Sequence, residues 1–393
     1  MTLSHGRPYL AIPGPSVMPD RVLAAMQRPA PNIYTGALHE MTATLLPDLR
    51  RIAGTDHHAA IYIANGHGMW EAALLNVLKR GDRVLAPVSG HFGQGWAATA
   101  RALGAQVEVI ESDGAGPVTP DRLEARLRED SRHEIRAVIA CHVDTATGVR
   151  AEMAEYRTAL GACGHPALLM ADCIASMGCD RFEMDAWGVD VAITASQKGL
   201  MTPPGLGFAF FNERAAEARE RADMVTPYWD WTPRAAPELY YQHFAGTAPT
   251  HHLYALRAAL DLIVEEGVEN VWRRHAALAA AIWAAVEVWG REGEMRLGVR
   301  EAQARSHAVT SIHLGAPDAD RLRAWCETQM GVTLGIGLGR TPPEGWFRIG
   351  HMGHVNAHMV LGALGVIEAG LSALSIPHAA GGVAAAARSL AAA

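Results

Sequence analysis

The 393-residue sequence has little of the features that point to a membrane, a disulfide scaffold or a nucleic acid. No apolar run reaches the roughly 18 residues of a membrane-spanning helix, and the first residues lack the pattern of a signal peptide. The five cysteines include no CxxC pair, which favours reduced thiols over disulfides or zinc. The net charge of -7 has no basic stripe. We therefore expect a cytoplasmic protein that binds neither membrane nor nucleic acid.

Lysine is also scarce, since Lys79 and Lys198 are the only lysines among 34 basic residues. Arginine replaces lysine at most solvated sites, but a guanidinium does not deprotonate and so forms no Schiff base with an aldehyde. Lys198 lies in the segment Ile193-Thr194-Ala195-Ser196-Gln197-Lys198-Gly199-Leu200. A lysine kept there indicates a chemical role, although composition alone leaves open that it merely survived a drift toward arginine.

An α/β fold is predicted between residues 58 and 212, where short β-rich runs alternate with helical stretches such as Gly68–Leu78 and Asp121–Glu129. This alternation is typical of a largely parallel sheet that is covered on both faces. The last two strands are joined by a short Gly/Pro-rich loop, so we expect the final strand to run antiparallel. The expected strands are Ala60–Ala64, Arg83–Ala86, Gln106–Ile110, Ala137–Cys141, Ala167–Ala171, Val189–Thr194 and Gly207–Phe211.

After about residue 252 the alternation of strands and helices gives way to long Ala-rich helical stretches, and a second, smaller α+β unit is predicted to follow. We expect an N-terminal arm (1–20), a large domain (21–266) and a small C-terminal domain (267–393). The Ala-rich tail from Gly381 is expected to be loosely ordered near its end. The expected helices are His252–Glu266, Asn270–Glu292, Asp318–Met330 and Ala357–Ser372, and the expected strands are Ala308–Leu314, Thr333–Leu334 and Trp346–Ile349.

Polar side chains follow the expected strands at their carboxyl ends, where ligands bind in open α/β sheets. Asn65-Gly66-His67 opens a helix and suits an anion, although an ordinary glycine turn explains it equally well. Asp172 ends the fifth strand, where an aspartate is rare unless it caps a helix or pairs with a cation. Lys198 follows the sixth strand. An acid beside an amine suits pyridoxal phosphate, because the acid keeps the pyridine nitrogen protonated while the lysine holds the aldehyde.

Three segments resemble class V aminotransferases: Ala171–Gly178, Ser196–Gly205 and Phe347–Gly353. The likeness runs from Ile12-Pro13-Gly14-Pro15 into the small domain and is strongest to the alanine–, serine– and aspartate–glyoxylate aminotransferases. It implies a fold type I transferase, with a mostly parallel seven-stranded sheet in an α/β/α sandwich and a smaller C-terminal α+β domain. It also implies that the protein depends on pyridoxal 5'-phosphate.

The resemblance implies roles for individual residues. Lys198 would form the Schiff base and then move a proton between the substrate α-carbon and the cofactor, and Asp172 would pair with the pyridine nitrogen. Arg348 would bind the substrate α-carboxylate through two parallel hydrogen bonds. The remaining cofactor contacts implied are Thr145 near the phenolic oxygen, Phe92 on the ring, Gly66, His67 and Gln197 at the phosphate, and Thr247 at the phosphate of a neighbouring subunit.

The contact of Thr247 implies a homodimer with shared active sites.

Two positions depart from the family pattern. Phe92 stands where the family often has a tryptophan, so ring stacking is retained over a smaller area. Phe244 stands where the family often has a phosphate-binding tyrosine, and whether Tyr240 or Tyr241 replaces it is open.

The implied reaction is a ping-pong transfer of an amino group from serine, alanine or aspartate to glyoxylate or pyruvate. Gly14 and Tyr34 are candidates for substrate binding, and Gly36 and Trp231 for the pocket of the donor side chain. One alternative is a pyridoxamine–pyruvate type of aminotransferase. The other is a lyase such as a cysteine desulfurase, which needs a cysteine on a mobile loop, whereas Cys326 lies in a predicted helix. The nineteen histidines form no metal-binding motif, so no metal is expected.

Overall fold

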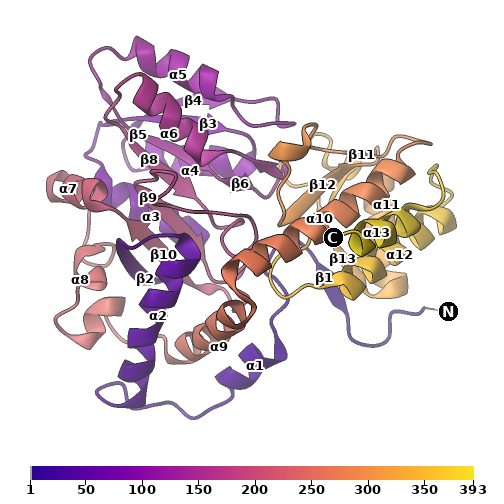
Figure 1. The fold of residues 1–393 in the computed structure, drawn as a ribbon, viewed down its shortest axis with the longest axis horizontal. Helices are drawn as coiled ribbons and strands as arrows, with labels where there is room; N and C mark the ends of the chain where they lie inside the picture. Colours follow the sequence, from indigo (N-terminus) through magenta and orange to yellow (C-terminus); the bar gives the residue numbers. More distant parts are fainter. Residues whose placement is uncertain (1) are drawn as a thin grey trace.

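The computed structural model describes residues 2–393, which form two β-sheets flanked by helices (Figure 1). The larger sheet has seven strands in the order β2-β10-β9-β8-β5-β3-β4. Each predicted strand is present within two residues at either end: β2 (His58–Ala64), β3 (Arg83–Val88), β4 (Gln106–Glu111), β5 (Ile135–Cys141), β8 (Leu168–Asp172), β9 (Val191–Ala195) and β10 (Gly205–Phe211). Strand β10 runs antiparallel to β9 and β2, as predicted, and the other pairs are parallel.

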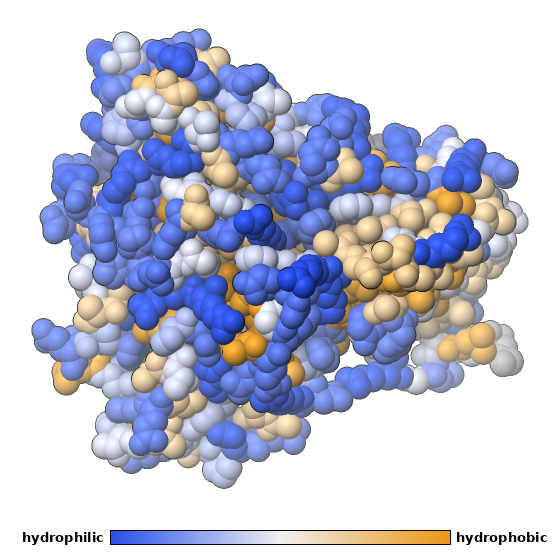
Figure 2. Space-filling model, viewed as in Figure 1, coloured by the Kyte–Doolittle hydropathy of each residue, from blue (hydrophilic) through white to orange (hydrophobic). Residues whose placement is uncertain are grey.

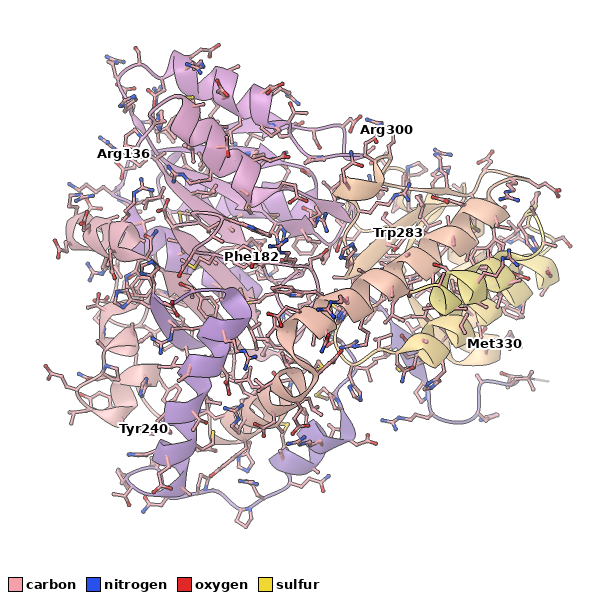
Figure 3. The ribbon with its side chains drawn as sticks, viewed as in Figure 1. Arg136, Phe182, Tyr240, Trp283, Arg300 and Met330 are labelled. Carbon is pink, nitrogen blue, oxygen red and sulfur yellow. The ribbon has the colours of Figure 1, made fainter. Side chains whose placement is uncertain are left out.

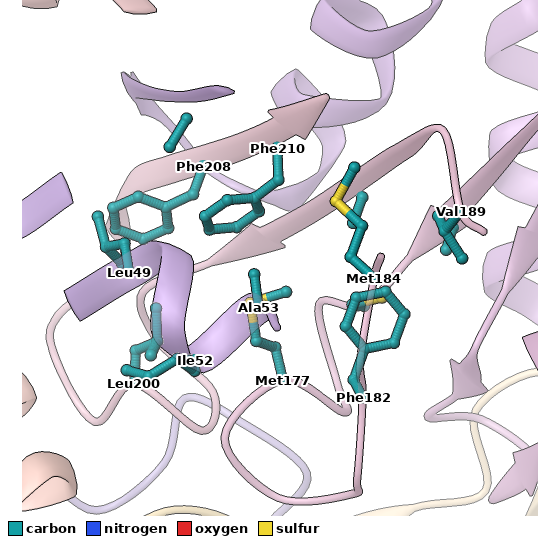
Figure 4. Packing of buried hydrophobic residues seen from close by; sticks show 14 of the residues in the cluster. Leu49, Ile52, Ala53, Met177, Phe182, Met184, Val189, Leu200, Phe208 and Phe210 are labelled. Carbon is teal, nitrogen blue, oxygen red and sulfur yellow. The ribbon is translucent and has the colours of Figure 1, made fainter. Parts of the chain in front are cut away.

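Helices cover both faces of this sheet, because its strands are apolar on both sides. In β10, Phe208 and Phe210 pack on one face, where Figure 4 shows them above Leu49 and Ile52 of α2. Neighbouring residues of the same strand point to the other face, which packs against α3, α4 and α7. The result is an α/β/α sandwich. Its helices are α2 (Ala37–Ala53), α5 (Pro120–Glu129), α6 (Met153–Ala162) and α9 (Thr250–Glu266) on the first face, and α3 (Gly66–Val77), α4 (His91–Ala102) and α7 (Glu213–Arg221) on the second.

The second sheet has five strands in the order β1-β13-β14-β12-β11. Its edge strand β1 comes from the N-terminal segment and pairs in parallel with β13, a contribution that the sequence did not predict. The boundaries of the three expected domains stay a prediction. The strands are β1 (Tyr9–Ala11), β11 (Arg296–Leu297), β12 (Val309–His313), β13 (Val332–Ile336) and β14 (Trp346–Gly350), and the helices beside them are α10 (Val268–Trp289), α11 (Asp318–Met330) and α12 (Ala357–Ala373).

The expectation of a loose C-terminal tail is wrong for residues 382–391, which form helix α13 (Gly382–Ala391). Gly382 lies so close to the indole of Trp289 that a side chain there would clash. Glu368 of α12 links α10 to α13, because its carboxylate accepts hydrogen bonds from Trp289 Nε1 at 2.8 Å and from the Val383 N–H at 3.0 Å. Small alanines let α13 pack closely on α10, and Figure 2 shows pale and orange surface over these C-terminal helices.

Contacts between the two sheet regions fix their relative position. Asp180 is fully buried and accepts hydrogen bonds from Ser306 Oγ at 2.9 Å and from the His307 N–H at 2.8 Å. Arg300, labelled in Figure 3 at the edge of the C-terminal region, pairs with Asp113 at 2.5 Å. Strand β14, which carries Arg348, is thereby held next to the carboxyl ends of the parallel strands.

Shorter elements complete the chain. They are α1 (Asp20–Met26), α8 (Thr232–Ala235), the hairpin β6 (Val143–Asp144) and β7 (Val149–Arg150), and three 3-10 turns at Tyr240–Phe244, Ala302–Ala304 and Pro343–Gly345. Across residues 2–393, no helix combines the length and the apolar character that crossing a membrane requires.

Candidate active site

A cavity of about 240 Å³ lies at the carboxyl ends of the parallel strands. A larger groove of about 640 Å³ runs between the N-terminal segment and α12, but neither of the two lysines lines it. The smaller cavity brings together most of the expected residues, which come from six separate segments of the chain. Those that line it are Gly14, Gly66, His67, Phe92, Thr145, Asp172, Gln197 and Lys198.

Lys198 follows β9 in a turn that the N-terminal segment holds in place. Ser16 donates from its hydroxyl to the Lys198 carbonyl at 2.7 Å and from its N–H to the Gln197 carbonyl at 2.9 Å. The Lys198 amine donates to the carbonyl of Pro13. Burial, together with the charge of Arg348, lowers the pKa of Lys198 to about 8. A substantial fraction of this amine is therefore neutral near pH 7 to 8, as a nucleophile requires.

Gly14 lies directly against the lysine. Its φ of +98° belongs to the left-handed region that favours glycine, and a Cβ there would lie 2.5 Å from the Lys198 Nζ. Any side chain would therefore displace the amine. Gly14 therefore leaves room for Lys198, and its expected contact with the substrate stays a prediction.

Asp172 forms the end of β8 and is 3% exposed. Its carboxylate accepts hydrogen bonds from Trp70 Nε1 at 2.7 Å, from the Ile174 N–H at 2.8 Å and from Cys141 Sγ at 3.7 Å. No helix begins after it, so it is not a helix cap. No cationic side chain of residues 2–393 forms an ion pair with it, and burial raises the pKa of Asp172 to about 6. A buried carboxylate of this kind fits a protonated ring nitrogen.

The start of helix α3 suits a phosphate. The N–H groups of Gly66 and His67 belong to the first helical turn and have no partner inside the helix, while Asn65 accepts from the Gly68 N–H at 3.2 Å. Ile174 packs against Gly66 so closely that a Cβ there would lie 2.6 Å from its Cδ1. The side-chain oxygen of Gln197 is buried and has no partner among residues 2–393. This cradle therefore fits a phosphate group.

Asp144, to which the sequence analysis gave no role, joins two of the expected residues. Its buried carboxylate accepts hydrogen bonds from the N–H groups of Phe92 at 2.8 Å and Gly93 at 3.1 Å, in the first turn of α4. The next residue is Thr145, which is 4% exposed and lines the cavity. Asp144 thus joins the first turn of α4, which carries Phe92, to the segment that carries Thr145.

Arg348 does not line the cavity itself but lies behind Thr145. It is 6% exposed and donates from Nε to the Ile336 carbonyl at 2.7 Å and from Nη1 to the Thr145 carbonyl at 2.8 Å. Burial lowers the pKa of Arg348 to about 10, so it stays charged at neutral pH. No carboxylate of the described residues pairs with it, which leaves its charge free for a substrate carboxylate.

Two further expected residues lie outside the cavity of their own chain. Tyr34 is 81% exposed, and Thr247 is exposed. The Tyr240 hydroxyl is within 3.0 Å of the Thr42 hydroxyl, whereas Tyr241 is 56% exposed. The idea that Trp231 borders the donor pocket is wrong, because this ring is fully buried and stacks on Phe211 at 4.2 Å.

The model of the family described as "Aminotransferase class-V" matches residues 9–341. The chain is 38% identical to the serine–glyoxylate aminotransferase of Methylorubrum extorquens, over 94% of this chain and 92% of that protein. It is 35% identical to the L-aspartate–glyoxylate aminotransferase of Paracoccus denitrificans, over 93% and 91% of the two chains. The solved structure of ureidoglycine–glyoxylate aminotransferase from Bacillus subtilis superposes with a TM-score of 0.89 at 26% identity, covering 98% of both chains.

The fold and the site define a fold type I transferase. More narrowly, this chain belongs to the class V aminotransferase family and is an aminotransferase.

Proposed function

We propose that the protein is a pyridoxal-phosphate-dependent aminotransferase that moves an amino group from serine, alanine or aspartate to glyoxylate or pyruvate in two half-reactions. The observation that carries the proposal is the pair of Asp172 and Lys198 in one buried cavity: a carboxylate without a cation and an amine with a lowered pKa. Relatives named for transfer from serine and from aspartate to glyoxylate support the substrate class.

The residues of the cavity would hold the cofactor at four points. Lys198 would bind the aldehyde, Asp172 the ring nitrogen, Thr145 the phenolic oxygen, and the start of α3 with Gln197 the phosphate. The ring of Phe92 would cover one face. When bound, pyridoxal phosphate supplies the aldehyde that takes up the amino group and a ring that withdraws electrons.

The chain's own groups then have separate tasks. Arg348 orients the substrate by its α-carboxylate, which places the α-carbon near the Lys198 amine. Lys198, whose pKa is about 8, would take a proton from that α-carbon and deliver it to the cofactor within the same half-reaction, and the second half-reaction would run this transfer in reverse. Asp172 holds a proton on the ring nitrogen, and the apolar side chains of Ile174 and Val143 keep water away.

We further propose a homodimer with shared active sites. Tyr34, Thr247 and Tyr241 are exposed on the single chain and would be covered by a second copy. Because the Tyr240 hydroxyl already meets Thr42, Tyr241 is the better candidate to replace the missing phosphate-binding tyrosine. A cytoplasmic location belongs to the same proposal.

The two alternatives find less support. A site for free pyridoxamine has no phosphate to bind, yet the segment Asn65-Gly66-His67 and the buried Gln197 oxygen suit a phosphate and include no carboxylate. A desulfurase needs a mobile thiol, yet Cys326 is fully buried inside α11 and burial raises its pKa to about 12.

A panel of amino donors tests the proposal. Purified protein loaded with pyridoxal phosphate is incubated with serine, alanine, aspartate, cysteine or pyridoxamine, each with glyoxylate or pyruvate. We expect glycine to form from glyoxylate with at least one of the three small amino acids. Release of sulfide from cysteine, or transfer from pyridoxamine alone, would overturn the proposal in favour of the corresponding alternative.

A further inference from the structure

Trp70, in the first half of helix α3, makes a hydrogen bond that reaches across the cavity floor to β8. Its indole Nε1 donates to Asp172 Oδ2 at 2.7 Å, and the side chain is 2% exposed. The other carboxylate oxygen accepts from the Ile174 N–H, and Cys141 adds only a weak thiol donor. Trp70 is therefore the strongest side-chain donor that Asp172 has.

Asp172 is subject to two opposing effects. Burial and the nearby charge of Asp144 raise the pKa of this carboxyl, the hydrogen bonds from Ile174, Trp70 and Cys141 lower it, and the net value is about 6. A hydrogen bond to a charged group typically changes a pKa by roughly one to two units. Without the indole N–H, the pKa of Asp172 would approach or pass 7, and much of the carboxyl would be neutral at physiological pH.

The indole is held rigidly in place for this contact. The His67 ring meets it edge-on at 4.5 Å and the Phe92 ring at 6.4 Å. On α4, Gly95 leaves it room, because a Cβ there would lie 3.0 Å from the Trp70 ring. The same side chain lines the cavity together with Asp172.

We propose that Trp70 is a positioning residue that keeps Asp172 ionised and directs its carboxylate toward the ring nitrogen. The inference rests on the proposed function, since it assumes that Asp172 faces a cofactor. Trp70 acts through Asp172 and does not itself exchange protons with the substrate.

The chain offers a matched control for this role. Trp96 on α4 is 1% exposed and packs in the same core as Trp70, but its indole N–H has no hydrogen-bond partner among residues 2–393. Replacing either tryptophan by phenylalanine removes a similar volume and one N–H group. Only at position 70 does that N–H contact a carboxylate.

The test compares Trp70→Phe with Trp96→Phe in cofactor-free protein. Infrared spectroscopy follows the band of the protonated carboxyl as the pH changes, with Asp172→Asn identifying the band that belongs to Asp172. We expect Trp70→Phe to raise the pKa of Asp172 by about one unit or more, and Trp96→Phe to leave it unchanged. In enzyme loaded with pyridoxal phosphate, the kcat of Trp70→Phe should be about tenfold below that of the wild type at pH 6.5 and should recover toward the wild-type value at pH 8.5.

An unshifted Asp172 in Trp70→Phe would overturn the inference even if activity fell. Should Trp70→Phe not fold, β-(3-benzothienyl)alanine at position 70 retains the ring size without the N–H, and the same shift is expected. Failure of the proposed function looks different, because wild-type protein would then form no glycine from any of the three amino donors, whatever the pKa of Asp172.

Discussion

The guanidinium of Arg348 donates from Nη1 to the main-chain carbonyl of Thr145 at 2.8 Å. This hydrogen bond joins β14 of the five-stranded sheet to the turn of the β6–β7 hairpin, which follows β5 of the seven-stranded sheet. Arg348, proposed to bind the substrate, and Thr145, proposed to bind the cofactor, are therefore held at a fixed position relative to each other. Any change in the position of one sheet relative to the other alters both at once.

Arg348→Lys should weaken donor and acceptor alike. A lysine ammonium is a point charge that cannot reproduce the two parallel donors of a guanidinium. A charge-assisted hydrogen bond contributes roughly 1.5–3 kcal/mol, so we expect KM to rise about ten- to a hundredfold for both substrates. Steady-state kinetics with each substrate varied in turn measures the effect.

Arg234 provides the control for this substitution. It is fully buried and donates to three main-chain carbonyls, those of Ile61, His243 and Tyr228. None of these residues lines the cavity, whereas Arg348 donates to Thr145, which does. Arg234→Lys should lower the melting temperature and leave KM unchanged. If Arg348→Lys behaves in the same way, Arg348 has only a structural role.

Asp172→Asn should leave the fold intact and lower kcat by orders of magnitude. A neutral amide cannot hold a proton on the pyridine nitrogen, so the ring loses most of its capacity to withdraw electrons. Turnover and melting temperature are measured on the same loaded sample. Turnover close to that of the wild type would show that the charge of Asp172 is not used.

Asp172 should also give the cofactor-free protein a distinct dependence of stability on pH. Its folded-state pKa of about 6 lies above the ordinary value of 3.8, so the folded chain binds more protons than the unfolded chain between these values. Stability therefore falls as the pH rises from about 4 to 6, by about 3 kcal/mol in total. Asp172→Asn should lack this decline. Denaturant unfolding of both proteins at several pH values across this range measures the free energy of unfolding. A difference in that free energy between wild type and Asp172→Asn that does not change with pH would contradict the expectation.

Mixing two inactive proteins tests the shared site. Lys198→Ala lacks the amine, and Thr247→Trp would block the contact with the phosphate of the neighbouring subunit. In a mixed dimer, one of the two sites contains neither substitution. At equal mixing half of the dimers are mixed, and half of the sites in those dimers are intact. Activity should therefore return to roughly a quarter of the wild-type level. Native mass spectrometry verifies that subunits exchange. Exchange without recovered activity would show that Thr247 does not serve the partner subunit.

The sequence was sufficient to predict the seven-stranded sheet because its strands are short apolar runs bounded by turns. The antiparallel direction of β10 followed from the missing crossover helix before it. Strand β1 escaped prediction because a run of three residues, Tyr9–Ala11, has no measurable alternation. Helix α13 was misjudged because its alanines resemble a low-complexity tail, and only the packing on Trp289 shows why small residues stand there.

The site could be predicted only where a motif carries it. Asp172 and Lys198 stand in recognisable segments, whereas Trp70 is 102 residues away from its carboxylate and no local pattern links the two. Its one available signal was an aromatic residue one helical turn after His67. Asp144 was passed over because its partners, the N–H groups that begin α4, are main-chain atoms. The roles proposed for Tyr34 and Thr247 depend on a second chain, which a single sequence does not place.

Reduction with borohydride tests the central claim most directly. Protein loaded with pyridoxal phosphate is reduced, digested and mapped by mass spectrometry, with Lys79→Arg and Lys198→Arg as matched variants of the only two lysines. We expect the stable adduct on Lys198 alone, unchanged in Lys79→Arg and absent in Lys198→Arg. An adduct on Lys79, or none in protein that retains the cofactor, would contradict the account of Lys198 as the residue that holds pyridoxal phosphate.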